Sequence, residues 1–206
     1  MLDKSVPHIS VIMVNHDATN YPEFHLPAGY SFCFYKDGLE EDWCRLQLET
    51  GQVLSMDSIR ARFETEFGNE KEKLTKRCIF VKAPNGEIIG TAMLWDGNTF
   101  GKMESRIHWV AVLDSHGGKG IAKALLSKIL GLNKSKFVYL TTQTGSYQAI
   151  YLYRKFGFEK YVGKTPENWK IVNFQEEKET AWQIIENKIA EHKPSWKTFN
   201  QVKSML

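Results

Sequence analysis

Apolar residues along this chain switch repeatedly between the two-residue spacing of strands and the 3.6-residue spacing of helices. Strands are predicted where apolar or aromatic side chains alternate or cluster between turn residues, at 9–14, 30–35, 78–82, 87–95, 104–112, 137–142, 158–162 and 169–174. Helices are predicted where apolar residues recur every three or four positions, at 40–49, 58–67, 121–132 and 146–156. This order indicates an α/β (α+β) domain, a mixed sheet with helices on its faces.

Glycine-containing turns separate the central elements. The Pro84-Asn85-Gly86 turn predicts a hairpin, because an Asn-Gly pair readily takes the positive φ angles of a tight turn. A second glycine-rich segment, residues 117–120, separates a predicted strand from the helix that follows it. The strand–loop–helix connection is therefore the most distinctive local feature of the chain.

The last 30 or so residues have a different pattern. An amphipathic helix is predicted there, and Pro194 is expected to end it; its stripe is formed by Ala181, Ile184, Ile185, Lys188 and Ile189. The stripe is compatible with packing on the same core, with a homodimer contact or with a lid over substrate. We predict a single domain over 1–206, with an N-terminal arm (1–29), a core (30–174) and a C-terminal helical extension (175–206).

Composition narrows the class of protein. The 206 residues are 42% hydrophobic and 25% charged, as in ordinary globular proteins. The 27 basic and 24 acidic residues are interspersed, which disfavours nucleic-acid binding. Cys33, Cys44 and Cys78 are widely spaced and histidines do not cluster, so neither a disulfide framework nor a metal site is expected. No apolar run approaches a membrane span and no signal peptide is recognisable, so a cytoplasmic protein without membrane contact is expected.

The loop between the predicted strand 104–112 and the next helix carries three glycines in four positions. Main-chain N–H groups at a helix N-terminus, with Lys119 beside them, suit a pyrophosphate, although a sharp turn that binds nothing needs the same glycines. A Walker loop is disfavoured because Gly120 follows Lys119 where a hydroxyl residue is required. A Rossmann fingerprint is disfavoured because Lys123 stands in place of its last glycine. The sequence therefore disfavours a nucleotide-dependent kinase or dehydrogenase, which would bind ATP or NAD.

The same loop resembles the signature of the GCN5-related N-acetyltransferases, the GNAT superfamily: Val-x-Pro, two residues, then Arg/Gln-x-x-Gly-x-Gly/Ala. Val112, Gly120 and Ala122 match this pattern, whereas Asp114 replaces the proline and Gly117 replaces Arg or Gln. The second replacement removes a side chain that helps to orient the pyrophosphate in other members. This replacement is expected to change the affinity for the pyrophosphate rather than the way in which it binds.

A second motif lies downstream in the right order. Residues 149–158 read Ala-Ile-Tyr-Leu-Tyr-Arg-Lys-Phe-Gly-Phe and resemble the family's Ala-x-x-Leu-Tyr-x-Lys-x-Gly-Phe helix, with Ser146 where Asn is usual. The resemblance covers roughly residues 30–174. It implies a mostly antiparallel sheet of six to seven strands. It also implies an acyl-CoA-dependent N-acyltransferase that moves acetyl from acetyl-CoA to a primary amine of a small molecule or peptide, without a metal.

The resemblance also assigns roles to residues. Tyr153 is the expected general acid, with Tyr151 as a less suited substitute, and His108 is the expected base, as in arylalkylamine-type members. The glutamate of histone-type members would fall at Arg106, which cannot act as a base, and Glu104 is an alternative base if the strand register differs. Cofactor contacts are expected from Val110, Ala111, Val112, Gly117, Gly118, Lys119, Gly120, Ile121, Ala122 and Tyr153. His116 is expected to face solvent or a phosphate, without a role in proton transfer.

Strand alternation predicts that Arg106, His108, Val110 and Val112 share one face of strand 104–112. The main-chain N–H of Val112, or of a neighbour on a bulge, is expected to polarise the thioester. Acceptor contacts, in which arginine can pair with an acidic group and tryptophan can stack on a ring, are expected from Trp43, Arg60, Arg62, Arg106, Trp109 and Trp169. The alternative is a non-enzymatic domain, either a CoA-binding sensor or a partner-binding module.

Overall fold

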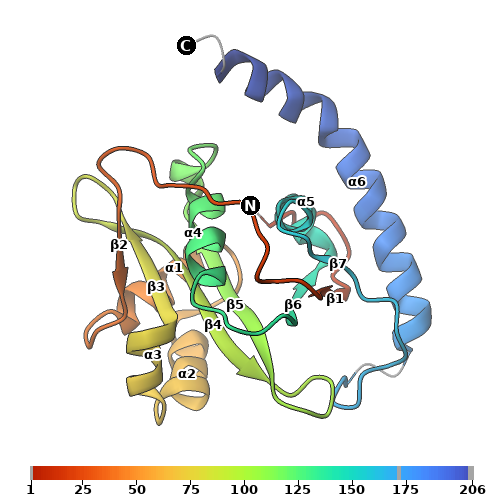
Figure 1. Ribbon diagram of the computed structural model, residues 1–206, viewed down its shortest axis with the longest axis horizontal. Helices are drawn as coiled ribbons and strands as arrows, with labels where there is room; N and C mark the ends of the chain where they lie inside the picture. Colours follow the sequence, from red (N-terminus) through yellow and green to blue (C-terminus); the bar gives the residue numbers. More distant parts are fainter. Residues whose placement is uncertain (1, 171–172, 204–206) are drawn as a thin grey trace.

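Seven strands form one sheet in the order β2-β3-β4-β5-β6-β1-β7 (Figure 1). The computed structural model describes residues 2–170 and 173–203, and the side chains of residues 2–170 and 173–192. All strand pairs are antiparallel except β5–β6, which is parallel. The strands are β1 (Ser10–Asn15), β2 (Ser31–Phe34), β3 (Cys78–Lys82), β4 (Ile88–Gly97), β5 (Glu104–Val112), β6 (Val138–Gln143) and β7 (Glu159–Lys160). The predicted mixed sheet is thereby confirmed.

Helices cover both faces of the sheet. They are α1 (Glu40–Glu49), α2 (Met56–Phe67), α3 (Lys71–Arg77), α4 (Ile121–Leu130), α5 (Tyr147–Arg154) and α6 (Phe174–Lys203), with short 3-10 turns at Asp114–His116 and Thr144–Ser146. Phe67 of α2 packs on Trp95 of β4, with ring centroids 5.0 Å apart. Leu125 of α4 packs over Gly90 of the same strand. Because positions 90 and 95 differ in parity, α2 and α4 lie on opposite faces, as Figure 1 shows.

Helix α3 was not predicted from the sequence. It has the sequence Lys-Glu-Lys-Leu-Thr-Lys-Arg, of which only Leu74 is buried. A single apolar position defines no period, so the pattern of this segment resembles that of a loop.

The predicted strand at 169–174 is wrong. Trp169 and Lys170 have no regular structure, Phe174 is the first residue of α6, and residues 171–172 lie outside the described part. Trp169 and Phe174 pack edge to face with ring centroids 5.8 Å apart, and Phe174 is buried with Ile12 and Val14 of β1. The aromatic pattern that predicted a strand therefore arises from a loop packed on the sheet.

Helix α6 packs on the same core as the rest of the chain, one of the three arrangements left open by its pattern. Its residues Ala181, Ile185 and Ile189 are buried in the main hydrophobic cluster. The prediction that Pro194 ends this helix is wrong, because α6 continues to Lys203 (Figure 1). Proline removes only one hydrogen bond of the helical ladder, at a cost of about 3 kcal/mol, and a long helix can tolerate that loss.

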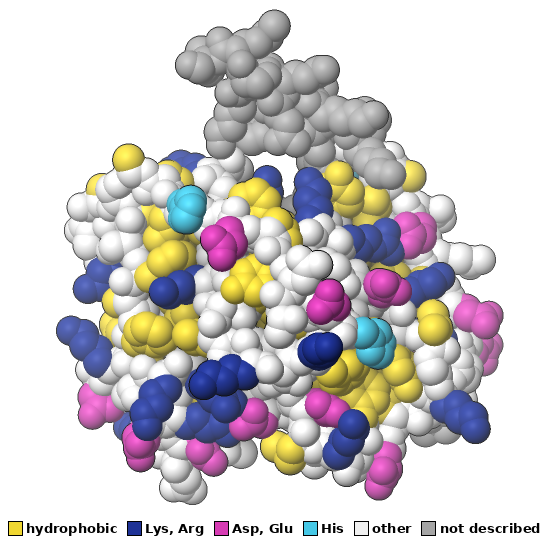
Figure 2. Space-filling view, viewed as in Figure 1, with side chains coloured by type: hydrophobic (Ala, Val, Ile, Leu, Met, Phe, Trp, Pro, Cys, Tyr) yellow, Lys and Arg dark blue, Asp and Glu magenta, His cyan; other side chains and the backbone are white. Residues whose placement is uncertain are grey.

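Polar groups are distributed without separation by charge. On the face shown in Figure 2, Lys and Arg side chains alternate with Asp and Glu. Cys33, Cys44 and Cys78 are free thiols. Across the described residues, no helix combines the length and apolar character needed to cross a bilayer, and no group of three or more potential metal ligands comes together.

Candidate active site

The site forms where β5 separates from β6. The parallel pairing of these strands ends at Ile107 and Leu140. Beyond this point β5 continues along β4 only, and β6 continues along β1 only. Beyond this point each of the two strands therefore has one edge without a strand partner. An opening lies between these two edges, in the middle of the sheet.

A β-bulge lies in β5 at this opening. Met93 pairs with His108 and Thr91 pairs with Ala111, so Trp109 and Val110 together face one residue of β4. Trp109 has φ +48°, the only positive φ among the described non-glycine residues. A backbone of this kind costs roughly 1–3 kcal/mol and is maintained by surrounding contacts.

The bulge corrects the predicted alternation of strand 104–112. His108 and Ala111 lie on the same face, because their partners on β4 are two residues apart. Val112 therefore lies on the opposite face from Arg106 and His108, not on the same one. The extra residue reverses the alternation at the point where β5 leaves β6, and nothing in the local sequence marks it.

Two cavities meet at the opening. The larger has a volume of about 310 Å³ and is lined by residues of β5, β6, α1, α2 and α5 together with the N-terminal arm. The smaller, of about 220 Å³, lies between the end of β5 and helix α5. The cavities share five lining residues, Gln52, Val110, Ser146, Ala149 and Tyr153. A ligand in one cavity would thus contact a ligand in the other beside Tyr153 and the bulge.

Half of the residues expected to contact the cofactor line the smaller cavity: Val110, Ala111, Val112, Ala122 and Tyr153. The other five, Gly117, Gly118, Lys119, Gly120 and Ile121, form the connection between two of these lining residues, Val112 and Ala122. Gly118 and Gly120 have φ of +72° and +84°. Gly120 is the N-cap of α4, so the left-handed conformation is required where the helix begins.

Tyr30 contacts two side chains of the glycine loop. Its hydroxyl lies 2.9 Å from His116 Nδ1 and accepts a hydrogen bond of 3.2 Å from Lys119 Nζ. His116 is therefore held by Tyr30, a contact that the sequence did not predict. The loop is connected in this way to the segment that precedes β2.

Tyr153 occupies the junction of the two cavities. Its side chain is 7% exposed, and burial raises the pKa of its hydroxyl to about 12. The phenol is therefore protonated at neutral pH and can donate a proton. Tyr151 lines neither cavity, and Lys155 Nζ lies over its ring, 4.7 Å from the ring centroid.

His108 lines the larger cavity and is bound to Glu66 of α2. Glu66 Oε2 accepts hydrogen bonds from His108 Nε2 at 2.9 Å and from Trp109 Nε1 at 3.0 Å, and its Oε1 accepts one from Arg62 Nε at 2.7 Å. Burial alone would raise the pKa of Glu66, but these three donors outweigh it and lower the pKa to about 2. Glu66 is thus ionised at neutral pH.

The imidazole of His108 is neutral at the same pH. Burial is the main cause that lowers its pKa to about 4; Arg106 and Arg62 add to this effect, and the hydrogen bond to Glu66 opposes it. An ionised Glu66 can only accept, so His108 carries its proton on Nε2 and has the lone pair on Nδ1. Glu66 therefore sets the tautomer of His108 and leaves Nδ1 as the acceptor atom of the ring, while the lowered pKa makes the imidazole a weaker base than free histidine.

Glu104, the alternative base, lines neither of the two cavities and pairs with Lys102 at 2.6 Å. Sequence reasoning also missed two residues at or beside the larger cavity. Glu66 resembles an ordinary surface residue of α2 that pairs with Arg62 four positions earlier. His8 lines the larger cavity and hydrogen-bonds to Gln143, but the N-terminal arm has no pattern that places it there.

Four of the six expected acceptor residues line the larger cavity: Arg62, Arg106, Trp109 and Trp169. The other two line neither cavity. Trp43 is fully buried and packs on Trp109 with ring centroids 5.1 Å apart. Arg60 is exposed and forms an ion pair with Glu41 at 2.7 Å.

Comparison with known proteins identifies the family. The model of the acetyltransferase (GNAT) family matches residues 39–158, more than half of the chain. Over 86 residues the chain is 30% identical to a glucosamine 6-phosphate N-acetyltransferase of Trypanosoma brucei brucei, covering 40% of this chain and 58% of that protein. An uncharacterised protein of Mycobacterium leprae is 36% identical over 63 residues, 31% of this chain and 17% of that protein. The chain thus spans less than two thirds of either curated relative.

Solved structures share the fold. A GCN5-related N-acetyltransferase from Sphaerobacter thermophilus superposes with a TM-score of 0.60 at 21% identity, covering 75% of this chain and 49% of that chain. A tandem GNAT protein from the clavulanic acid biosynthesis pathway gives a TM-score of 0.52 at 16% identity, covering 77% and 52%. With two cavities at a split sheet, the fold is that of an acyltransferase scaffold. The chain belongs to the acetyltransferase (GNAT) family.

Proposed function

We propose that this protein is an acyl-CoA-dependent N-acyltransferase that moves acetyl from acetyl-CoA to a primary amine. The observation that carries the proposal is the separation of β5 from β6, with two cavities that meet at Tyr153 and Val110. Such an arrangement suits a reaction between two bound molecules. The relative named as a glucosamine 6-phosphate N-acetyltransferase supports transfer to an amine.

We place the thioester end of acetyl-CoA in the smaller cavity. Residues 110–112 of β5 have no neighbouring strand on the β6 side, and Ala122 lies in the first turn of α4, the helix that follows the glycine loop. Strand-edge amides and the N-terminus of α4 are suitable donors for an extended chain and a pyrophosphate. Bound there, acetyl-CoA supplies a thioester carbonyl to an amine and a sulfur that departs as a thiol. We expect main-chain N–H groups at the Trp109–Val110 bulge to polarise that carbonyl.

His108 acts as the general base in this proposal. An amine of pKa about 10.4 is some 3.4 units above pH 7, so removing its proton costs roughly 4.6 kcal/mol. The Nδ1 lone pair of His108 accepts this proton, and Glu66 stabilises the resulting imidazolium through Nε2. Because the pKa of His108 is about 4, the residue passes the proton on to solvent in the larger cavity rather than retaining it.

Tyr153 acts as the general acid. A pKa of about 12 keeps its hydroxyl protonated throughout the neutral range. The residue lines both cavities and can therefore reach the sulfur at their junction. It donates a proton to the departing sulfur, whose thiol pKa is about 8.5 in water.

The test is release of free thiol from acetyl-CoA across a panel of amines: polyamines, amino acids, aminoglycosides, arylalkylamines and peptides. Calorimetry with acetyl-CoA measures binding independently. Turnover of at least one amine, lost in His108→Ala and in Tyr153→Phe while acetyl-CoA still binds, supports the enzyme. Binding without turnover of any amine would favour a CoA-binding sensor, and absence of binding would reject the assignment.

A further inference from the structure

Arg106 has an unusual environment in the larger cavity. Its Nη2 donates to Thr141 Oγ1 at 2.8 Å, which holds the guanidinium at the opening between β5 and β6. Its Nε is enclosed and has no hydrogen-bond partner. Among the described residues no carboxylate lies within ion-pair distance of Arg106, and Glu66, the carboxylate whose charge acts on it from farther away, already accepts from three other donors. Arg106 is thus a partly buried cation without a counter-ion.

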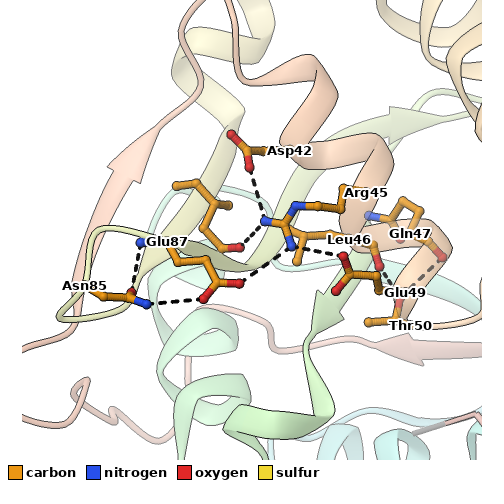
Figure 3. Close-up of polar contacts among 9 residues, drawn as sticks. Asp42, Arg45, Leu46, Gln47, Glu49, Thr50, Asn85 and Glu87 are labelled. Atoms are coloured by element: carbon orange, nitrogen blue, oxygen red, sulfur yellow. Dashed lines mark hydrogen bonds and ion pairs between the residues drawn. The ribbon is translucent and has the colours of Figure 1, made fainter.

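Other partly buried arginines of the chain are neutralised. Arg45 on α1 donates to Asp42 and to the carbonyl of Ile88, and it pairs with Glu49 and Glu87 (Figure 3). A cation removed from water without a partner is costly, and burial lowers the pKa of Arg106 accordingly. Three carboxylates neutralise Arg45, whereas Arg106 has none, and this contrast points to an anion site at Arg106.

Two further polar groups of the same cavity also lack partners. Gln47, at the end of α1, is 0% exposed, and neither its Oε1 nor its Nε2 forms a hydrogen bond (Figure 3 shows its main-chain carbonyl near Thr50). Trp169 Nε1 is likewise buried without an acceptor. Buried polar groups are normally satisfied, so these atoms indicate a polar ligand. Three of the four unpartnered atoms on these residues are N–H donors, which favours an acceptor-rich anion.

We propose that the amine acceptor carries an anionic group, a carboxylate or a phosphate monoester, that binds Arg106 with help from Gln47 and Trp169. This inference rests on the acyltransferase activity proposed above and names the class of its acceptor. Arg106 and His108 share a face of β5 two positions apart, about 6.6 Å along the strand. The amine and the anionic group should therefore be separated by several bonds, which favours ω-amino acids or aminoalkyl phosphates over α-amino acids.

The experiment compares matched acceptors that differ only at the far end of the chain. ω-Amino carboxylates of two to six carbons, ω-aminoalkyl phosphates and ω-amino alcohols of the same lengths are assayed by thiol release. We expect kcat/KM for the best anionic acceptor to exceed that for its alcohol by at least tenfold. Whether the carboxylate or the phosphate is better identifies the source of the anion.

Arg106→Gln is the decisive variant, and Arg60→Gln is its control, because Arg60 is an exposed, paired arginine outside both cavities. Arg106→Gln should abolish the preference for the anionic acceptor over its matched alcohol, mainly by raising KM for the anionic acceptor. Arg60→Gln should keep the preference. Equal kcat/KM for charged and uncharged acceptors in the native protein, or a preference that survives in Arg106→Gln, would overturn the inference while leaving the acyltransferase in place.

Anion binding is also measured without turnover, so that failure of the inference is distinguishable from failure of the enzyme. An ω-hydroxy carboxylate of the preferred length cannot be acetylated on nitrogen but retains the anion. It should raise the melting temperature of the native protein and of Arg60→Gln, and not that of Arg106→Gln. Absence of this shift in the native protein refutes the anion site, whether or not any amine is acetylated.

Discussion

The pH dependence of a His108→Ala variant tests the base directly. In the native protein the imidazole is already neutral above pH 5, because its pKa is about 4, so kcat/KM should show no acid limb between pH 5 and 7. In the proposed mechanism His108 takes the proton of a bound ammonium. The variant has lost this base and must wait for acceptor molecules that are already deprotonated in solution.

The size of the defect follows from the pKa of the acceptor. For an amine of pKa about 10.4 the free base is roughly one part in 2,500 at pH 7, so the defect should approach 2,500-fold. It should shrink tenfold for each pH unit and reach about 25-fold at pH 9. An acceptor with an amine of pKa near 8 should reduce the defect at pH 7 to about tenfold.

The assay is thiol release at saturating acetyl-CoA and low acceptor, from pH 5 to 9.5. His16→Ala is the matched control, since His16 lines neither cavity, and it should follow the native profile. A defect in His108→Ala that is the same at every pH would refute the base role. The same pH-dependent defect in His8→Ala would assign the role to His8, which lines the same cavity.

Three further predictions concern single groups. Tyr153→Phe keeps the buried ring, so kcat should fall about 100-fold while acetyl-CoA affinity and melting temperature stay within error, by calorimetry and thermal melts. Glu66→Gln should cost about 1.5–3 kcal/mol at pH 7 in urea melts, because three donors lose a carboxylate. The folded-state pKa of Glu66 is lowered to about 2, so the stabilisation by its carboxylate is present above about pH 4.5 and is lost as the pH falls towards 2. Between these pH values the free energy of unfolding, measured by urea melts, should depend less on pH in Glu66→Gln than in the native protein. Gly120→Ala should destabilise by about 1–2 kcal/mol through its φ of +84° alone, since an added Cβ meets no atom within 4 Å, and a neutral result would contradict this.

Much of the fold was predictable from local patterns. The Asn85-Gly86 turn and the strands beside it, α1 at Glu40–Glu49 and β5 at Glu104–Val112 all have periods or turn residues that act between near neighbours. The failures have the same origin. The strand expected at 169–174 and the helix end expected at Pro194 followed local rules that packing overrode.

The sequence by itself predicted which residues would carry the chemistry: the glycine loop before α4, His108 on β5 and Tyr153 on α5. Only the tertiary structure decided on which face of the sheet these residues lie and which partners they contact. The β5 bulge reverses the alternation beyond His108, Glu66 reaches His108 across 42 residues of chain, and Arg106 is left without a counter-ion. Local periodicity reflects interactions between near neighbours, whereas the tautomer of His108 and the surroundings of Arg106 depend on contacts that exist only after α1 and α2 have packed on the sheet.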